Sequence, residues 1–118
     1  MSLSPISDAT SVTLQQALDG LQQRQDAIAA NVANLETPGY LAREVDFETS
    51  LRSAISTDRP DRFAVTEDRS LAATRLNGNN VNIDFELMAG EENALRQQLT
   101  VQALNAKYAL LRTAISGQ

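Results

Sequence analysis

The 118-residue chain contains no cysteine, no histidine and no tryptophan. Without imidazole and thiol groups it lacks the commonest transition-metal ligands, the usual general base and the thiol nucleophile. Catalysis would have to use carboxylates, hydroxyls, lysine or arginine. No disulfide can form, so the sequence is compatible with either a reducing or an oxidising compartment. The residues therefore predict no metal site and no cofactor, and an enzyme is the least expected class of protein.

Aromatic residues are scarce, at 4% of a chain that is 42% hydrophobic, so burial must come from aliphatic side chains along elongated elements. The ten basic residues stand singly among fifteen acidic ones, which argues against nucleic acid as a partner. No apolar run is long enough to span a bilayer, and the N-terminal residues lack the basic and apolar regions of a cleavable signal peptide. We expect no direct membrane insertion, and any export should proceed without such a signal.

Apolar residues recur at alternating steps of four and three from Leu14 to Leu35, with Gln25 at the one polar position. This pattern is typical of a coiled-coil seam and predicts a helix over residues 11–35. Pro38 disfavours the helical conformation at Thr37, and Pro38–Gly39 suits the centre of a type II turn, so the helix must end before them. The predicted seam consists of Leu14, Leu18, Leu21, Ile28, Val32 and Leu35.

Residues 36–80 predict a turn, a short amphipathic helix and then a loop or a short pair of strands. The helix takes Asp46 as its N-cap and ends at residues 58–61. Its apolar face consists of Phe47, Leu51 and Ile55. The loop or strand pair lies between Pro60 and Asn80, where the chain is polar.

A second long helix is predicted over residues 84–116, with Asp84 as its N-cap after the turn signal of residues 77–80. Gly90 costs this helix about 1 kcal/mol relative to alanine. Its apolar stripe consists of Leu87, Ala94, Val101, Leu104, Tyr108, Leu111 and Ile115, and Met88, Leu95 and Leu99 lie on the adjoining flank. The apolar face is wider than contact with one partner helix needs.

These segments predict an all-α fold, a single elongated domain over residues 1–118. Two long terminal helices pack as an antiparallel coiled-coil-like hairpin around a short irregular middle region. Val101, Leu104, Tyr108, Leu111 and Ile115 are expected to face the N-terminal seam, and both sets to serve assembly. Because the surplus apolar surface of the C-terminal helix marks a protein contact, we expect the isolated chain to be marginally stable or partly disordered until it assembles.

The most informative stretch is residues 24–34, which leads into Thr37-Pro38-Gly39-Tyr40. Asparagine is a mediocre helix former that tends to satisfy backbone groups near helix ends, so the pair at positions 31 and 34 is notable. The stretch resembles the N-terminal signature of flagellar rod, hook and hook-associated proteins. Its motif residues are Asn31, Asn34, Thr37, Pro38, Gly39 and Tyr40. Residues 42–48 and 78–88 are similar to the proximal rod members of that family.

The resemblance implies a structural subunit of the rod of the bacterial flagellar basal body, delivered by type III export to the periplasmic space without a cleavable signal. It implies self-association and contacts with other rod subunits, the rod-base adaptor protein, the membrane-ring protein and the export apparatus. It implies no cofactor. The motif residues would fix the turn that redirects the chain after the first helix.

Two other functions remain open at this point. One is another axial rod protein of the same family; the other, from a different class, is a small helical export chaperone or adaptor. The adjacent carboxylates Glu91 and Glu92, like Asp46 and Glu48, could suggest a catalytic pair. Near neighbours on a helix point away from each other, however, so a solvated surface is the better interpretation.

Overall fold

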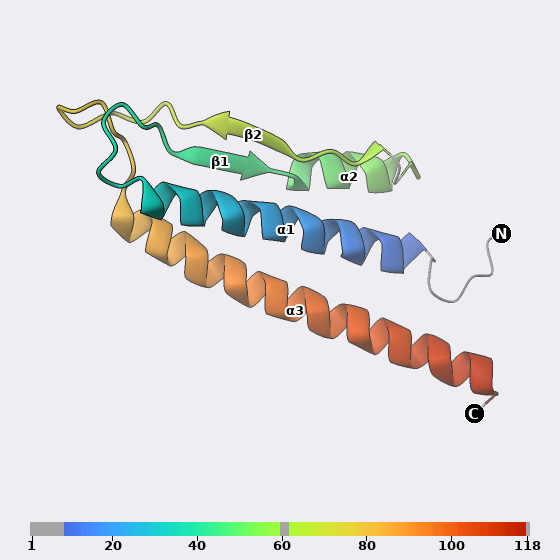
Figure 1. Cartoon of the computed structure of the whole chain (residues 1–118). Helices are drawn as coiled ribbons and strands as arrows, with labels where there is room; N and C mark the ends of the chain where they lie inside the picture. Colours follow the sequence, from blue (N-terminus) through green and yellow to red (C-terminus); the bar gives the residue numbers. More distant parts are fainter. Residues whose placement is uncertain (1–8, 60–61, 118) are drawn as a thin grey trace.

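The computed structural model describes residues 9–59 and 62–117. The chain order is α1 (Ala9–Ala33), β1 (Arg43–Asp46), α2 (Glu48–Ser56), β2 (Thr66–Arg69) and α3 (Ile83–Ser116). The molecule is elongated, with extents of 64 × 26 × 15 Å, and both long helices run along its length (Figure 1). In the part of the chain just defined, no helix is long and apolar enough to cross a membrane.

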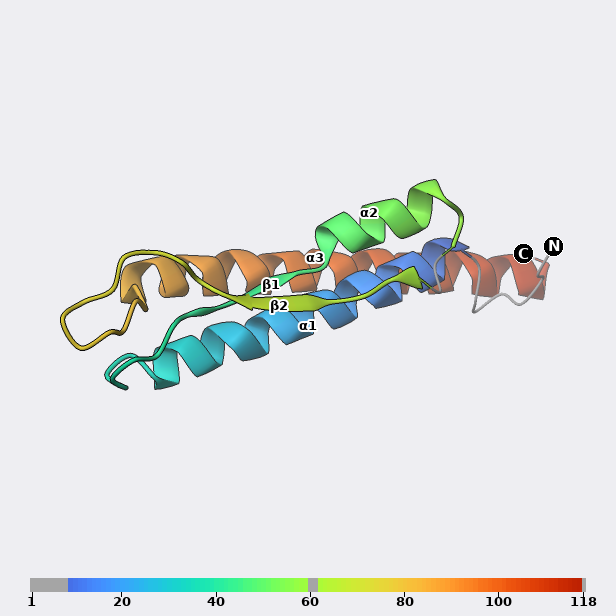
Figure 2. The ribbon, with the colours of Figure 1, turned by 90° about the horizontal axis from the view of Figure 1, so that it is seen from above.

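Helix α1 is the central element. It contacts α3 on one side and β1 and α2 on the other, as Figures 1 and 2 show from two directions. The long helices are antiparallel, because Asn31 bonds Glu86 near one end while Gln15 bonds Tyr108 near the other. The prediction of a mostly helical chain with two long terminal helices packed together is therefore confirmed. The small sheet is an addition to the predicted all-α class.

The end of α1 follows from the Pro-Gly pair. The Tyr40 N–H donates to the Thr37 carbonyl across Pro38 and Gly39 (3.3 Å), and Gly39 has a φ of 75°. A left-handed residue at this place is what a type II turn requires, and glycine adopts it without steric cost. The helix itself stops at Ala33, so Leu35 lies in the turn and not on the helix.

Two expectations for the middle region need correction. Where a loop or a pair of strands was expected between residues 60 and 80, the described residues form a loop with one strand, β2; its antiparallel partner is β1, which precedes α2, with Arg43 opposite Arg69 and Asp46 opposite Thr66. Four residues are too few for a clear alternating pattern, although Val45 is buried and its neighbours are exposed.

The predicted N-cap of α2 also needs correction. Phe47, with no side-chain cap, precedes the first helical residue, although the Asp46 carboxylate still accepts a long bond from the Thr49 N–H (3.4 Å). Phe47 therefore lies outside the helix, and Ile55 on its predicted apolar face is exposed. Of the predicted helix end, Pro60 and Asp61 lie outside the described residues.

The main hydrophobic core lies between α1 and the middle region. Leu21, Ala27, Val45 and Phe47 form it, and Ala17, Leu51, Phe63 and Val65 pack against it. Leu21 therefore belongs to this core, although its heptad position predicted the contact with the C-terminal helix. The reason is Phe47, the largest buried side chain of the cluster, whose ring lies directly over Gly20.

Helix α3 begins one step earlier than predicted, and Asp84 is not its cap. The Asn82 side chain accepts from the Phe85 N–H (3.2 Å) and caps the helix. Asp84 lies in the first turn, where its negative charge still complements the helix dipole.

Two glycines on the long helices give opposite predictions. A Cβ at Gly20 would overlap the buried Phe47 ring, whereas a Cβ at Gly90 would lie 3.7 Å from Ile28 Cγ2, an ordinary contact. We expect Gly20→Ala to destabilise the fold by about 1–3 kcal/mol through overpacking. Gly90→Ala should stabilise it by up to about 1 kcal/mol through helix propensity. Urea denaturation of both variants measures this, and a more stable Gly20→Ala protein would contradict the packing.

Candidate functional site: the Asn31 junction and the outer face of α3

Asn31 joins three elements at the end of α1. Its side chain is 1% exposed, and its Oδ1 accepts from the Arg43 N–H (2.8 Å) and the Tyr40 hydroxyl (3.1 Å). Its Nδ2 donates to the Arg43 carbonyl (3.0 Å) and to Glu86 Oε1 (3.1 Å). Both lone pairs and both N–H groups are used. One amide thus ties α1 to the start of β1 and to the first turn of α3.

The second motif asparagine acts more locally. Asn34 Nδ2 donates to the Ala30 carbonyl (2.8 Å), and its Oδ1 accepts from the Thr37 hydroxyl (3.0 Å). The Ala30 carbonyl also accepts from the Asn34 N–H (3.0 Å), so the first bond reinforces the last turn of the helix, and the second joins that turn to Thr37. Asn34 thus links the last turn of α1 to the turn that follows it.

Two further asparagines lock the loops beside the motif, and the sequence indicated them only as a turn signal. Asn79 Nδ2 donates to the Asn34 and Thr37 carbonyls (2.9 and 2.8 Å). Asn80 Oδ1 accepts from the Ala42 N–H (2.7 Å), and its Nδ2 donates to the Ser70 carbonyl (3.0 Å). Both side chains are buried although they belong to a loop. The spacing of residues in the sequence does not reveal this burial.

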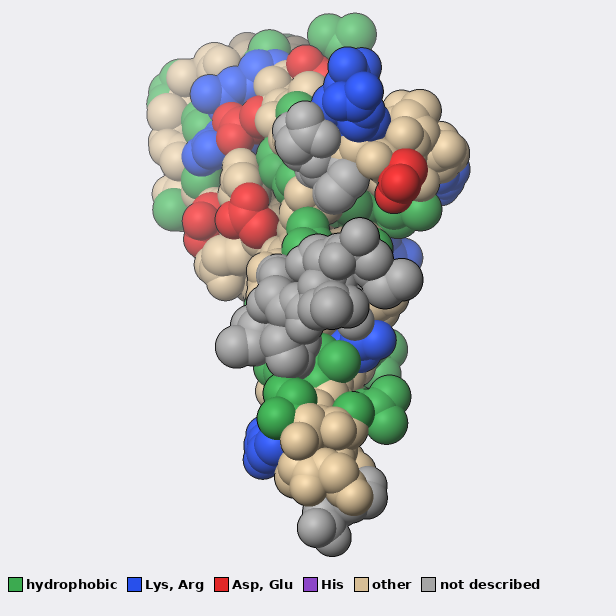
Figure 3. Space-filling view, turned by 90° about the vertical axis from the view of Figure 1, so that its right-hand side faces the viewer, with side chains coloured by type: hydrophobic (Ala, Val, Ile, Leu, Met, Phe, Trp, Pro, Cys, Tyr) green, Lys and Arg blue, Asp and Glu red, His purple; other side chains and the backbone are tan. Residues whose placement is uncertain are grey.

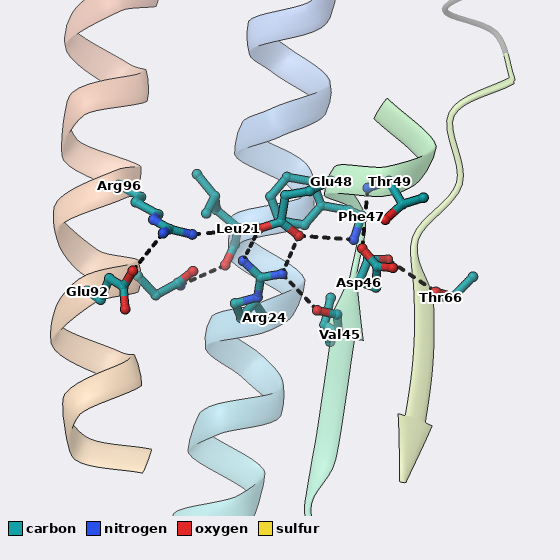
Figure 4. Close-up of polar contacts among 11 residues, drawn as sticks. Leu21, Arg24, Val45, Asp46, Phe47, Glu48, Thr49, Thr66, Glu92 and Arg96 are labelled. Carbon is teal, nitrogen blue, oxygen red and sulfur yellow. Dashed lines mark hydrogen bonds and ion pairs between the residues drawn. The ribbon is translucent and has the colours of Figure 1, made fainter. Parts of the chain in front are cut away.

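A cluster of charged residues connects the three helices (Figure 4). Arg24 of α1 donates to Glu48 Oε2 of α2 (2.7 Å) and to the Val45 carbonyl of β1 (2.8 Å). Arg96 of α3 lies 3.7 Å from Glu48 and 2.6 Å from Glu92. The hydrogen bond from Arg24 lowers the pKa of Glu48 below its ordinary value. Because these side chains are partly exposed, each pair contributes little to stability.

Glu86 is the unusual carboxyl of the site. It is 4% exposed, and removal from water raises its pKa above the ordinary value, opposed by the hydrogen bond from Asn31 and reinforced by the charge of Glu44. A buried carboxylate with one amide donor is poorly compensated. The residue therefore costs stability when it is ionised.

A groove of about 580 Å³ opens between β1 and α3, with α1 along its floor. Its lining includes alanines at positions 27, 42 and 89 together with arginine and glutamate side chains of all the surrounding elements. In the chain outside residues 1–8, 60–61 and 118, no three acidic side chains gather closely enough to hold a metal ion.

The predicted seam residues of α1 divide between the two sides of the helix. Leu21 and Ile28 are buried, Leu14, Leu18 and Leu35 are half-buried, and Val32 is exposed. Gln25, the polar position, bonds a buried amide of α3: Asn93 Nδ2 donates to Gln25 Oε1 (3.0 Å) and to the Leu21 carbonyl (2.9 Å). The polar interruption of the heptad pattern is therefore matched by a polar residue across the interface.

The predicted residues of α3 also divide. Leu104, Tyr108 and Leu111 are half-buried toward α1, where the Tyr108 hydroxyl accepts from Gln15 (2.6 Å), while Val101 and Ile115 are exposed. A second apolar stripe lies elsewhere on the helix. Leu95 follows the buried Asn93 by two positions, which is about 200° around a helix, and so points away from α1. The outer stripe consists of Phe85, Met88, Leu95, Leu99 and Leu110, all of them exposed.

The Asn31 junction predicts unequal effects for the two motif asparagines. Asn31→Ala removes a partner from both backbone groups of Arg43 and leaves Glu86 without its donor, so it should cost roughly 2–4 kcal/mol. Asn34→Ala removes two local bonds, to the Ala30 carbonyl and from the Thr37 hydroxyl, and should cost about 1 kcal/mol. Urea denaturation of the two variants side by side tests this, and equal losses would mean that Asn31 does not hold the junction.

Glu86 predicts a distinctive pH dependence. Its folded-state pKa is raised, so the folded state binds this proton more tightly than the unfolded state, and stability falls as pH rises through the raised pKa. Glu86→Gln should therefore be more stable than the parent at neutral pH, and the gain should vanish as pH falls below that pKa.

Glu48→Gln is the matched control, because its lowered pKa reverses the sign. Glu48 contributes stability above the unfolded pKa and loses it as pH falls through the folded pKa. This variant should therefore be less stable at neutral pH and converge with the parent in acid. Chemical denaturation across a pH series measures both, and a neutral-pH loss in Glu86→Gln would contradict the burial of its charge.

Comparison with known proteins agrees with the motif. Residues 13–40, which include most of α1 and the Pro-Gly turn, match a family model described as flagella basal body rod protein. The chain is 34% identical to the flagellar basal body rod protein FlgB of Bacillus subtilis (strain 168), over 88% of this chain and 91% of the relative.

Two further FlgB proteins are similar to this chain over most of its length. Identity is 31% to FlgB of Escherichia coli (strain K12), over 79% of this chain and 83% of the relative. Identity is 33% to FlgB of Cereibacter sphaeroides, over 87% and 91%. The matched length includes the terminal helices and the region between them, and the family is one of structural rod subunits and not of enzymes. The resemblance seen in the sequence is thus confirmed: the chain belongs to the FlgB family of flagellar basal body rod proteins.

Proposed function

We propose that the chain assembles in the proximal part of the rod, in the periplasmic space, and that the outer stripe of α3 makes the contacts between subunits. The observation that carries this proposal is the row of five large apolar side chains exposed on α3. A helix with apolar residues on two opposite sides normally packs against partners on both. Here α1 covers one side, and neighbouring subunits would cover the other.

The stripe has the spacing of a helix-packing surface. Phe85 and Met88 are three positions apart, and Leu95 and Leu99 are four apart, so they stand in line along α3. A charged residue, Glu92, occupies the intervening turn and is engaged by Arg96. Since exposed large apolar side chains gathered along one face of a helix commonly mark a protein contact, a protein partner is the natural complement.

Growth of a rod requires two different surfaces on each subunit. A contact between unlike surfaces does not close on itself, so it can repeat along a helical array. The outer stripe supplies one such surface. The exposed members of the predicted seams, Val32, Val101 and Ile115, lie on other faces and would supply further contact area where α1 and α3 leave apolar side chains uncovered.

The remaining predicted assembly residues would hold the two helices in the shape that assembles. Those of α1 are Leu14, Leu18, Leu21, Ile28 and Leu35, and those of α3 are Leu104, Tyr108 and Leu111. In this proposal the whole chain acts as one elongated domain. It would reach the rod through the type III export apparatus, and contact other rod subunits, the adaptor protein at the rod base and the membrane-ring protein.

A charge on the outer stripe should block assembly and leave the fold intact. Leu99 is 56% exposed, so Leu99→Asp removes little from the monomer, but burying the new carboxylate in a subunit contact would cost several kcal/mol. Gln98→Asp is the matched control, because it adds the same charge to an exposed neighbour outside the stripe. We expect loss of motility and of rod incorporation for Leu99→Asp only, measured in cells and in purified basal bodies.

Circular dichroism shows whether the two variants fold alike. Motile cells with Leu99→Asp present in their basal bodies would exclude the stripe as a subunit contact. Cross-linking of the native chain to the adaptor at the rod base supports the proximal position, and contacts with distal rod subunits alone would assign another axial protein. A chain that stays in the cytoplasm as a stable monomer or dimer would instead be an export chaperone or adaptor.

A further inference from the structure

The groove between β1 and α3 holds carboxylates that its own arginines do not neutralise. The arginines of its lining, at positions 24, 43 and 96, are each paired with another carboxylate, as Figure 4 shows for two of them. Glu44 of β1 and Glu86 of α3 also line the groove. Within residues 9–59 and 62–117, neither of these two carboxylates has an ion-pair partner. The groove therefore carries negative charge that is open to an incoming cation.

Glu86 is the carboxylate that gains most from such a cation. It is buried, and its Oε1 accepts from Asn31, whose other N–H is already given to the Arg43 carbonyl. Burial raises the pKa of Glu86, opposed by the hydrogen bond from Asn31 and reinforced by the charge of Glu44. A positive group within hydrogen-bond distance would favour the charged form of the carboxyl. Glu86 and Glu44 together thus suit an ammonium or guanidinium group.

A second observation points to a ligand that donates hydrogen bonds. Asn93 lines the groove about two turns further along α3, and it is 2% exposed. Its Nδ2 donates to the Leu21 carbonyl and to Gln25 Oε1, but its Oδ1 is buried and accepts no hydrogen bond from the residues that the structure describes. A buried acceptor without a donor is unfavourable, so an N–H brought by a ligand would be bound here.

The groove has room for a segment of chain. Its volume of about 580 Å³ exceeds that of a single charged group, and the small side chain of Ala89 lines it between Glu86 and Asn93. Those two residues are seven positions apart, which is roughly 10 Å along the helix axis. About three residues of extended chain cover the same length. One segment can therefore place a basic side chain at Glu86 and an N–H at Asn93.

Phe85 connects the groove to the outer stripe. Its side chain lines the groove, and it is also the first exposed member of the stripe. A protein that covers the stripe therefore also covers the mouth of the groove. This continuity favours a protein, and not a free ion, as the source of the cation.

The distribution of charge agrees with a cationic partner at this place. All fifteen acidic residues precede position 101. Figure 3 views the molecule from the end of α3, where the limb formed by that helix shows hydrophobic and basic surface but no acidic surface. A positively charged surface is therefore attracted to the part of the chain that carries the groove, and not to the end of α3.

We propose that the groove binds an arginine or lysine side chain of the protein that covers the outer stripe. Glu44 and Glu86 are the anionic groups that meet this side chain, and Asn93 Oδ1 accepts an N–H of the same segment. The inference rests on the proposed function and adds to it the chemistry of the partner, whose contact surface carries a cation beside its apolar side chains.

Binding of a small cation tests the site on the purified chain. The probe is N-acetyl-argininamide, and NMR of the isotope-labelled protein follows the amides of Glu86 and Asn93. N-acetyl-citrullinamide is the control probe, because it has nearly the same shape without the charge. We expect saturable shifts with the arginine probe. Its binding should weaken by about tenfold or more in the double variant Glu44→Gln with Glu86→Gln. Equal binding of both probes, or no saturable shift, overturns the site.

Incorporation into the rod tests whether a protein supplies the cation. In the same double variant, a glutamine at position 86 still accepts from Asn31, so the fold should be at least as stable as the parent. Asp19→Asn with Glu36→Gln is the matched control, because it removes two charges from exposed residues outside the groove. We expect about tenfold less of the groove variant in purified basal bodies, normal amounts of the control, and unchanged melting curves for both.

The proposal requires both results. Normal incorporation of the groove variant overturns it, and binding of the arginine probe would then mean that the groove holds free cations only. Reduced incorporation without binding of the probe also overturns it. If the native chain is present in basal bodies and the groove variant is incorporated equally well, this inference fails while the rod function stands; absence of the native chain from basal bodies refutes the function itself.

Discussion

The fold depends on one buried amide. Asn31 stands where α1 ends, and its four hydrogen bonds hold the start of β1 and the first turn of α3 at fixed positions. A buried amide that satisfies all its bonds specifies geometry in a way that an aliphatic side chain cannot, because each bond has a direction. The β1–β2 ribbon, the adjoining loops and the course of α3 all follow from this junction.

Once the junction is set, the hydrophobic core forms on one side of α1 only. Phe47 closes over Gly20 and Leu21, and Arg24 covers the ring at 4.8 Å and ties it to α2. Helix α3 is left outside this core. It therefore packs against α1 along one face and keeps a second apolar face exposed. That exposed face is available for contacts with other proteins.

Much of this architecture could be predicted from the sequence. Hydrophobic periodicity located both long helices, the Pro-Gly pair located the turn, and the excess of apolar residues on the second helix indicated a surface for partners. The spacing could not reveal which element would pack against each side of α1. The position of Leu21 suits both a heptad seam with the second helix and a contact with Phe47. Strands of four residues are too short for an alternating apolar pattern to be recognised. Asn79 and Asn80 are buried because they bond backbone carbonyls that come close to them only in the folded chain. Asp84 and Asn82 are both residue types that cap helices, and spacing does not decide between them. In the structure Asn82 accepts the Phe85 N–H and is the cap.

The contacts between α1 and α3 have a chemical character of their own. Gln15 meets Tyr108, Gln22 meets Gln97, and Gln25 meets Asn93, so a ladder of uncharged groups runs along the two helices. Hydrogen bonds between uncharged groups are weakened little by dissolved ions, which screen interactions between charges. These three contacts between the long helices therefore depend little on the ionic composition of the surrounding fluid, whereas the Asn31–Glu86 bond near the other end of the pair includes an ionisable group.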